Sequence, residues 1–357
     1  RIPNRQPLKS QYGLSLIELM VSLVIGLILT AAVLQTFIGS RVSYSMQTEL
    51  AKLQENARFA MTFLKRDLQR AGYHGCKLYS YYGENVSTIL NDQSDDTTTA
   101  WFKPLSVTDA TFPVSDSFRV RFTDATGGCT VDKDAPVAKN AGDQQYHFQC
   151  QAAHTFQKGN ILVASDCEHL AIFQMTNDNS ALTATTIEHV QDTVLLPGNC
   201  VGGLGANSQC GTTVVNEVYA DWKPGTVVQR FANQAYSIGA SSFDTSVKAL
   251  KRGNLDLVEG VENMQVELGV DTDNDSSANC YAPDPDTCGG TIDNVVALRI
   301  SLMMVSIKNN LMDSRPNNEF KGTVFDDPRY TVPDDRRLRK VFSSTVALRN
   351  RLIENDD

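Results

Sequence analysis

The stretch KSQYGLSLIELMVSLVIGLILTAAVLQTF, residues 9–37, decides the fold of this chain. From Leu14 to Phe37 it runs for 24 residues with Glu18 as its only charge, which is long enough to cross a bilayer as one helix. A charged side chain at the middle of a bilayer costs roughly 2.5–3.5 kcal/mol, so a carboxylate inside such a segment points to a function. The stretch predicts a membrane anchor and leaves Glu18 to be explained.

The residues before this apolar segment are basic. Arg1, Arg5 and Lys9 are the charged residues among the first thirteen, and cations beside a span tend to stay on the cytoplasmic side. Without these three, 29 basic residues face 41 acidic ones in the rest of the chain. An acidic body argues against a broad nucleic-acid-binding surface, because phosphate binding needs clustered cations.

All the cysteines lie after the apolar segment, which suits an oxidising compartment and disulfide bonds. Short separations favour pairing Cys200 with Cys210 and Cys280 with Cys288, while the full connectivity stays open. Metal binding is the alternative, since CQAAH and CEH place cysteine near histidine, but zinc sites usually repeat at tighter spacing. The eight disulfide candidates are Cys76, Cys129, Cys150, Cys167, Cys200, Cys210, Cys280 and Cys288.

A short basic leader, then Gly13, then LSLIELMVSLVIGLIL resembles the type III signal and amino-terminal helix of type IV pilins and type II secretion pseudopilins. In that family a prepilin peptidase cuts after the glycine and methylates the new amino terminus. The resemblance implies cleavage between Gly13 and Leu14 and N-methylation of Leu14. It also places Glu18 at the fifth mature position, where an acid is typical, although the first mature residue is most often phenylalanine.

Two explanations of Glu18 remain open. In a bundle of such helices a buried carboxylate needs a cation, and the freed amino terminus of a neighbouring subunit is the nearest candidate. Glu18 would then set the axial register of assembly. Alternatively, Glu18 belongs to an ordinary anchor and reaches the membrane surface from the first helical turn, where the helix dipole also favours it.

Helical spacing continues after the span in ELAKLQENARFAMTFLKRDLQRAGYHG, residues 49–75. Apolar residues recur three or four positions apart and predict one stripe that packs on the protein's own sheet, with a stop near Gly72. The stripe comprises Leu50, Leu53, Ala57, Ala60, Leu64, Leu68 and Ala71. We therefore expect a basic leader (1–13), a transmembrane half-helix (14–38), an amphipathic half-helix (39–72) and a β-rich body (73–357).

The body reads as strands and loops. Residues alternate between apolar and polar in SFRVRFTD, and later in the segments 264–270, 296–304 and 342–348, as half-buried strands do. Three strands in succession without a long helix between them predict an antiparallel meander. The predicted fold class is α+β, with a long amino-terminal helix packed on an antiparallel sheet that carries disulfide-closed loops.

Two later segments, LVEGVENMQVELGVDTDND (257–275) and RRLRKVFSSTVALRNRL (336–352), resemble the body of PilW-type minor pilins. That family implies a noncatalytic protein that primes type IV pilus assembly in a tip complex. Its expected partners are other minor pilins, the major pilin, prepilin peptidase and the inner-membrane assembly machinery. Its expected location is the bacterial inner membrane, as a single-pass protein with a periplasmic body, and then the surface pilus. Residues 78–258 match no motif.

Asp271, Asp273 and Asp275 form a D-x-D-x-D loop with Asn279 at the ninth position, which makes calcium a hypothesis. The glycine and glutamate that an EF-hand has at its sixth and twelfth positions are missing, so a solvated acidic turn is the alternative. Apart from calcium, no cofactor is expected. No nucleotide-binding or catalytic motif appears, so an enzyme has no positive support in the sequence.

The run DDRRLRKV, residues 334–341, gathers four cations. We expect a solvated strand edge that blocks aggregation, and rank contact with DNA or an acidic partner below it. Two rival functions use the same anchor: a J-class pseudopilin of a type II secretion system, and a membrane-anchored periplasmic binding protein or enzyme.

Overall fold

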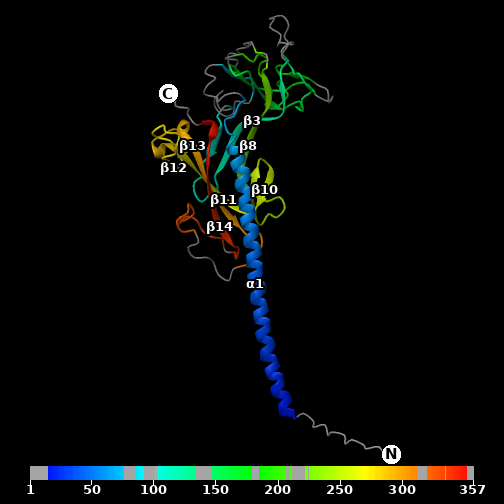
Figure 1. The fold of residues 1–357 in the computed structure, drawn as a ribbon, viewed down its shortest axis with the longest axis vertical. Coiled ribbons are helices and arrows are strands. Elements are labelled where there is room, and N and C mark those ends of the chain that lie inside the picture. Colours follow the sequence, from blue (N-terminus) through cyan, green and yellow to red (C-terminus); the bar gives the residue numbers. More distant parts are fainter. Residues whose placement is uncertain are drawn as a thin grey trace, which may run out of the picture.

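A computed structural model of the chain describes residues 15–75, 85–91, 101, 103–132, 147–178, 185–205, 210, 222–223, 225–311, 320–333 and 335–351. Its dominant feature is one helix, α1 (Leu16–Leu68), of 53 residues. The first half of α1 projects from the body as a bare stalk, and the second half packs along the body (Figure 1). This arrangement confirms the predicted fold class.

Both ends of α1 follow from local chemistry. Ser15 caps the first turn, because its side-chain oxygen accepts the backbone N–H of Glu18 at 3.2 Å. After Leu68 the chain turns, and Gly72 has a φ of 78°, a left-handed conformation that glycine adopts without a steric penalty. The backbone N–H of Gly72 then donates to the carbonyl of Arg121 at 2.9 Å. The helix end is thus tied directly to the sheet.

The second half of α1 buries the predicted apolar stripe. Leu53, Ala57, Ala60, Leu64 and Leu68 are each at most 3% exposed, and they share one core with residues of the two main sheets. Ala71 is buried beyond the helix end, and Leu50 packs at the edge of this core. Alanines on the stripe let the helix axis approach the strands closely. The amphipathic pattern therefore encodes helix-on-sheet packing, as expected.

A polar contact sits inside this apolar interface. The hydroxyl of Tyr236 donates to a carboxylate oxygen of Asp67 at 2.5 Å, and Asp67 is 2% exposed. Arg252 lies 3.9 Å from the same oxygen. Burial and the neighbouring carboxylate raise the pKa of Tyr236, so the phenol stays protonated and remains a donor. The pair joins the last turn of α1 to the sheet.

The larger sheet has eight strands in the order β1-β6-β5-β8-β3-β2, with β9 paired to β8 and β10 paired to β9. Strands β3 and β8 are each 14 residues long and pair antiparallel from Phe118–Tyr236 to Thr130–Val227. Because both strands are long, one end of the pair contributes side chains to the core under α1 and the other end contributes to a separate core. The bounds are β1 (Val86–Thr88), β2 (Leu105–Thr108), β3 (Ser117–Thr130), β5 (Ile161–Ser165), β6 (Leu170–Gln174), β8 (Val227–Ala240), β9 (Lys248–Arg252) and β10 (Leu255–Glu259).

The smaller sheet is the predicted meander. Its order is β12-β11-β13-β14, and every neighbouring pair is antiparallel. Register runs Leu268–Leu298–Val346, which places the alternating apolar residues of the three main strands on the α1 side. The bounds are β11 (Val261–Val270), β12 (Cys280–Ala282), β13 (Val295–Val305) and β14 (Arg339–Ala347), with short 3-10 helices η2 (Pro285–Cys288), η3 (Ile292–Asn294) and η4 (Arg349–Arg351).

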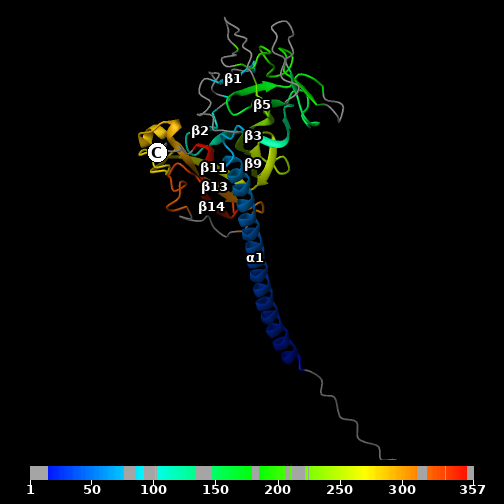
Figure 2. The same ribbon diagram turned by 45° about the horizontal axis from the view of Figure 1, so that its top comes forward.

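The described residues between β3 and β8, within the range 131–226, form a distal lobe at the end of the molecule away from the start of α1 (Figures 1 and 2). It contains β5, β6 and the small ribbon of β4 (His147–Gln149) with β7 (Thr186–Glu188). Its core is separate from the helix core and centres on Phe148, Phe156 and Phe173, none of which is measurably exposed. The two largest hydrophobic clusters of the described body are thus the helix core and the lobe core, and the β3–β8 ladder joins them.

The basic run 334–341 differs from the expected solvated edge. Arg339 is 3% exposed and contacts two carboxylates, Glu262 at 2.7 Å and Asp335 at 2.6 Å. Arg337 is only partly exposed, whereas Arg336 and Lys340 are exposed. The prediction of a fully solvated edge was wrong for Arg339, because two acids from separate segments neutralise its charge and allow burial.

Candidate functional site

The apolar half of α1 is the first candidate site. All residues from Ser15 to Tyr44 are exposed, so this apolar surface meets no part of the described body. The stretch within α1 is long and apolar enough to cross a membrane. Its hydroxyl groups bond within the helix: Thr30 donates to the carbonyl of Gly26 at 2.7 Å, and Thr36 donates to that of Ala32 at 3.0 Å. Such bonding removes the cost of exposing these hydroxyls to lipid.

Glu18 lies in the first turn of α1 on the exposed stalk. Its backbone N–H is held by Ser15, while its side chain has no ion pair with any described residue. The predicted processing residues Gly13 and Leu14 lie outside the described residues, so their cleavage and methylation stay predictions. The role of Glu18 in assembly also stays a prediction.

The cysteines form a framework in the body. The structure has the bonds Cys129–Cys150, Cys200–Cys210 and Cys280–Cys288, of which the last two are the short pairings that the sequence favoured. Cys167 is also disulfide-bonded, and Cys76 lies outside the described residues. With these cysteines oxidised, the zinc alternative that used Cys150 and Cys167 is excluded, since zinc needs thiolates.

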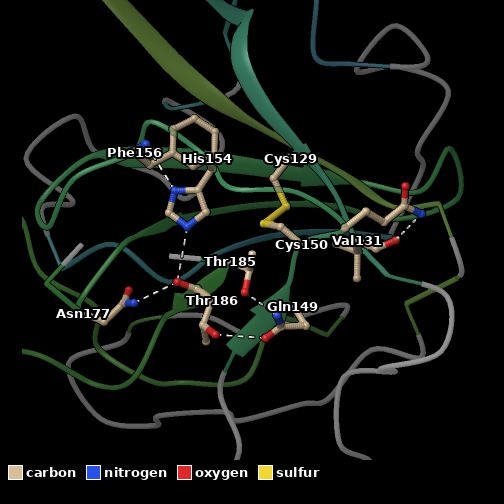
Figure 3. The surroundings of a disulfide bond; sticks show 10 residues. Cys129, Val131, Gln149, Cys150, His154, Phe156, Asn177, Thr185 and Thr186 are labelled. Atoms are coloured by element: carbon tan, nitrogen blue, oxygen red, sulfur yellow. Dashed lines mark hydrogen bonds between the residues drawn. A yellow bond between two sulfur atoms is a disulfide. The ribbon is translucent and has the colours of Figure 1, made fainter. Parts of the chain in front are cut away.

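The Cys129–Cys150 bond ties β3 to the residue that follows β4, and both cysteines belong to the core of the distal lobe (Figure 3). Beside it, His154 accepts the backbone N–H of Phe156 at 3.2 Å through Nδ1 and contacts the carbonyl of Thr186 at 3.3 Å through Nε2. Burial lowers the pKa of His154, so it serves as a neutral structural link between loops. This histidine therefore links two loops of the lobe.

The acidic loop between β11 and β12 brings the three predicted aspartates together. One oxygen from each of Asp271, Asp273 and Asp275 lies within 4.8 Å of the others, and oxygen donors suit calcium. Asp273 and Asp275 are exposed, whereas Asp271 is 3% exposed. The spacing of the motif therefore does produce a cluster of carboxylates.

Asp271 already has a structural task in this loop. Its carboxylate accepts the backbone N–H groups of Asp273 at 3.2 Å, Asn274 at 2.8 Å and Ser276 at 2.9 Å. Burial acts to raise the pKa of Asp271, but these backbone bonds outweigh it and hold the pKa below the ordinary value. The geometry fits a hydrogen-bonded acidic turn without requiring an ion, and calcium binding stays a prediction.

The body also has a groove beside α1 that the sequence analysis did not predict. It has a volume of about 640 Å³ and lies between α1, β10 and the end of β13. Phe59 and Phe63 of α1 line it, together with Leu257 and Ile307, and Phe59 is 45% exposed. A signal was present in the sequence, because two phenylalanines four residues apart fall outside the buried stripe.

Comparison with protein-family models gives two matches. Residues 8–34 match the prokaryotic N-terminal methylation motif, and residues 235–350 match the family described as type IV pilus-assembly protein W. The first match covers the membrane-spanning part of α1, and the second covers the end of β8 through β14 with the four-stranded sheet. No curated protein and no solved structure matches the chain.

A methylation motif on an apolar helix, followed by a β-sheet body with disulfides, defines a pilin-like protein. Such a protein is anchored in a membrane and associated with a pilus. The body match and the amino-terminal motif occur together, and the two similarities support, more particularly, a type IV pilus minor pilin of the PilW type.

Proposed function

We propose that this pilin is a noncatalytic assembly component that primes type IV pilus formation and sits in a tip complex with other minor pilins. The observation that supports the proposal is that one chain combines an exposed apolar helix with a large body that has separate helix and lobe cores. The helix suits packing among other pilin helices. A body of this size is hard to repeat along a tightly packed shaft, whereas a cap needs only a few copies.

The proposed pathway begins in the bacterial inner membrane, with the chain as a single-pass protein and its body in the periplasm. Prepilin peptidase removes the leader after Gly13 and methylates Leu14, and the assembly machinery then adds the subunit to the pilus. The disulfides support a body folded in an oxidising compartment. The partners proposed are other minor pilins and the major pilin. Neither an enzymatic reaction nor a nucleic acid is part of the proposal.

The central test compares pili and secretion in a strain that lacks the chain. We expect few or no surface pili, lost twitching motility and unchanged protein secretion, because the assembly primer is missing. Mass spectrometry of the full-length protein recovered from pili should show a methylated amino terminus at Leu14. Lost secretion with normal pili would show a pseudopilin instead, and an intact leader would rule out the pilin pathway.

Glu18 provides a sharper prediction within this proposal. Glu18→Ala should leave membrane insertion intact, because it removes a charge from an apolar segment. It should reduce incorporation into pili by at least tenfold, because the carboxylate would no longer pair with the amino terminus of a neighbouring subunit. Ser22→Ala, one turn along the same helix, is the matched control. Quantitative immunoblots of membranes and sheared pili provide the measurement, and normal incorporation of the alanine variant would refute the role.

A further inference from the structure

The four-stranded sheet has one open edge. Its last strand, β14, pairs with β13 on one side and with no described strand on the other. β14 has nine residues, whereas the strands at the other ends of the two main sheets, β1, β2, β10 and β12, have three to five. An unpaired edge presents a row of backbone N–H and C=O groups to an incoming strand. Within the described body, β14 is therefore the edge best suited to accept another strand.

The pairing with β13 shows which backbone groups of β14 face outwards. The N–H of Ser306 donates to the carbonyl of Leu338 at 2.8 Å. The N–H of Leu348 donates to the carbonyl of Val296 at 2.9 Å. Because hydrogen-bonded pairs alternate along an antiparallel ladder, even-numbered residues of β14 bond to β13 and odd-numbered ones point their backbone groups away. Five residues thus have outward backbone groups that no described residue hydrogen-bonds: Arg339, Val341, Ser343, Thr345 and Ala347.

The opposite edge of the same sheet is covered. The backbone N–H of Asp116 donates to the carbonyl of Met264 at 2.9 Å, and the Ser115 hydroxyl accepts the N–H of Met264 at 3.0 Å. The carboxylate of Asp116 accepts the N–H of Val266 at 2.8 Å, and β12 pairs with the end of β11. The chain therefore covers one edge with a loop and a short strand, and no described segment does the same for β14.

The side chains of β14 indicate the composition of a strand that could join it. Phe342 is partly buried against the helix core and Val346 lies within it, so apolar side chains of an added strand would extend this core. Ser343 and Thr345 are exposed on the other face, which suits polar neighbours. Residues 341–348 carry no charge, so the charged side chains that usually block strand addition are missing from most of this edge.

Two exposed cations, Arg336 and Lys340, lie where this edge begins. Neither makes an ion pair with a described residue, and the Lys340 ammonium lies 5.8 Å from the centre of the Phe342 ring. Every pair in this sheet is antiparallel, so we expect an added strand to run antiparallel to β14 and to end near these cations. An acidic residue at the carboxyl end of the added strand would be attracted to them.

A second copy of this chain is a poor occupant because of the membrane anchor. Asn350, just after β14, donates to the carbonyl of Ala71, just after α1, at 3.0 Å. Near the start of β14, Lys308 donates to the Ser45 hydroxyl at 2.6 Å, so β14 and α1 run in the same direction. Antiparallel pairing of two β14 edges needs a two-fold axis perpendicular to the sheet, which would reverse one α1 relative to the other. Two copies anchored in one membrane cannot meet this condition.

We propose that β14 accepts an extended segment of a different polypeptide, which adds antiparallel to the open edge of the four-stranded sheet. The segment is apolar at alternate residues and acidic near its carboxyl end. Backbone hydrogen bonds supply the affinity, and the alternating side chains supply the selectivity. The inference goes beyond the proposed function, because it concerns the edge of the sheet and does not depend on a place at the pilus tip.

Photo-cross-linking of the full-length chain, in the cells that naturally produce it, tests the proposal. Benzoylphenylalanine replaces Ser343, Thr345 or Ala347 in separate variants, and Phe243 in the turn between β8 and β9 is the control position. All four residues are exposed, so the probe should be tolerated. We expect each β14 probe to capture one and the same polypeptide at least tenfold more than the control.

The order of the captured residues is the decisive readout. For each step of two residues forward along β14, mass spectrometry should place the captured residue about two positions earlier in the partner, as antiparallel pairing requires. Absence of capture, captured residues in any other order, or a peptide from a second copy of this chain would overturn the proposal. Capture is scored in total membranes, so the result is independent of whether the chain enters pili.

A backbone variant tests the hydrogen bonds directly. Thr345→Pro removes an N–H that points away from β13, and edge strands tolerate proline at such positions. With the probe at Ser343, this variant should lower capture at least fivefold, whereas the matched control Thr345→Ala keeps the N–H and should retain capture. The melting temperature of the purified full chain reports whether the body stays folded. Undiminished capture by folded Thr345→Pro would overturn strand addition, and the order of the cross-links decides the question if this variant does not fold.

Discussion

At the residue scale, Asp67 shows how one acid fastens the helix to the sheet. It lies three residues after Leu64 and seven after Ala60, on the buried side of α1, where a charged side chain needs a partner. In the structure its side chain accepts the hydroxyl proton of Tyr236 in a buried contact between two distant segments. The contact specifies the angle at which α1 leaves the body, because both partners are held by their own elements.

Asp67→Ala should therefore destabilise the body by about 2–4 kcal/mol, because it leaves the Tyr236 hydroxyl buried without an acceptor and Arg252 without its nearest carboxylate. Chemical denaturation of the detergent-solubilised full chain measures the loss. Glu168→Ala is the control, since its partner Lys223 and Glu168 itself are about half exposed, and such pairs contribute less than about 1 kcal/mol. Equal effects in the two variants would contradict this account of Asp67.

At the element scale, long periodic segments were predictable and the contacts of loops were not. The stripe on α1 and the alternation in β11, β13 and β14 repeat over many residues, so each segment records which side is buried. For the acidic loop, the sequence shows only that acidic residues are frequent and gives no repeating pattern. Its backbone positions follow from Asp271, whose three N–H partners require a turn that no repeating pattern describes.

The calcium hypothesis belongs to this loop. If the three aspartates hold calcium, millimolar calcium should raise the melting temperature of the full chain and release or absorb heat in calorimetry. The double variant Asp273→Asn with Asp275→Asn should abolish both effects while keeping the Asp271 turn. No heat and no change in melting temperature for the unmodified chain would reject calcium and leave the hydrogen-bonded acidic turn.

At the scale of the whole molecule, the distal lobe lies within the part that the family matches leave out, residues 35–234. The body match spans residues 235–350, whereas the lobe spans 131–226 between β3 and β8. The long ladder of these two strands carries a second core away from the membrane anchor. The lobe can therefore vary without disturbing the packing of α1 on the sheet.

His189 makes this lobe sensitive to acid. Its ring packs between Phe148 and Phe173 at centroid distances of 5.2 Å, and Nδ1 lies 2.9 Å from the carbonyl of Gly202. Burial lowers the pKa of His189 to about 4. Unfolding restores an ordinary pKa near 6.5, so the unfolded state binds more protons between these values and stability falls as pH decreases through that window.

We expect the lobe to lose about 2 kcal/mol of unfolding free energy between pH 7 and pH 5 because of His189. Fluorescence of Trp222, a residue of the lobe core, reports the transition in a Trp101→Phe background. His189→Phe should reduce the dependence on pH, while the control His147→Gln in the same background should retain most of it, because His147 is only partly buried. An unchanged pH profile in His189→Phe would refute the assignment.

The sequence by itself determined the anchor, the long helix, the meander and the family of this protein. These features follow from uninterrupted apolar runs and from local periodicities. The apolar residues recur once per helical turn or at every second strand residue, so the sequence itself shows which side of each element avoids water. Only the tertiary structure decided the Asp67–Tyr236 contact, the burial of Arg339 and the separate core of the distal lobe. Each of these depends on segments brought together from distant parts of the chain, and their positions follow from the packing of whole elements.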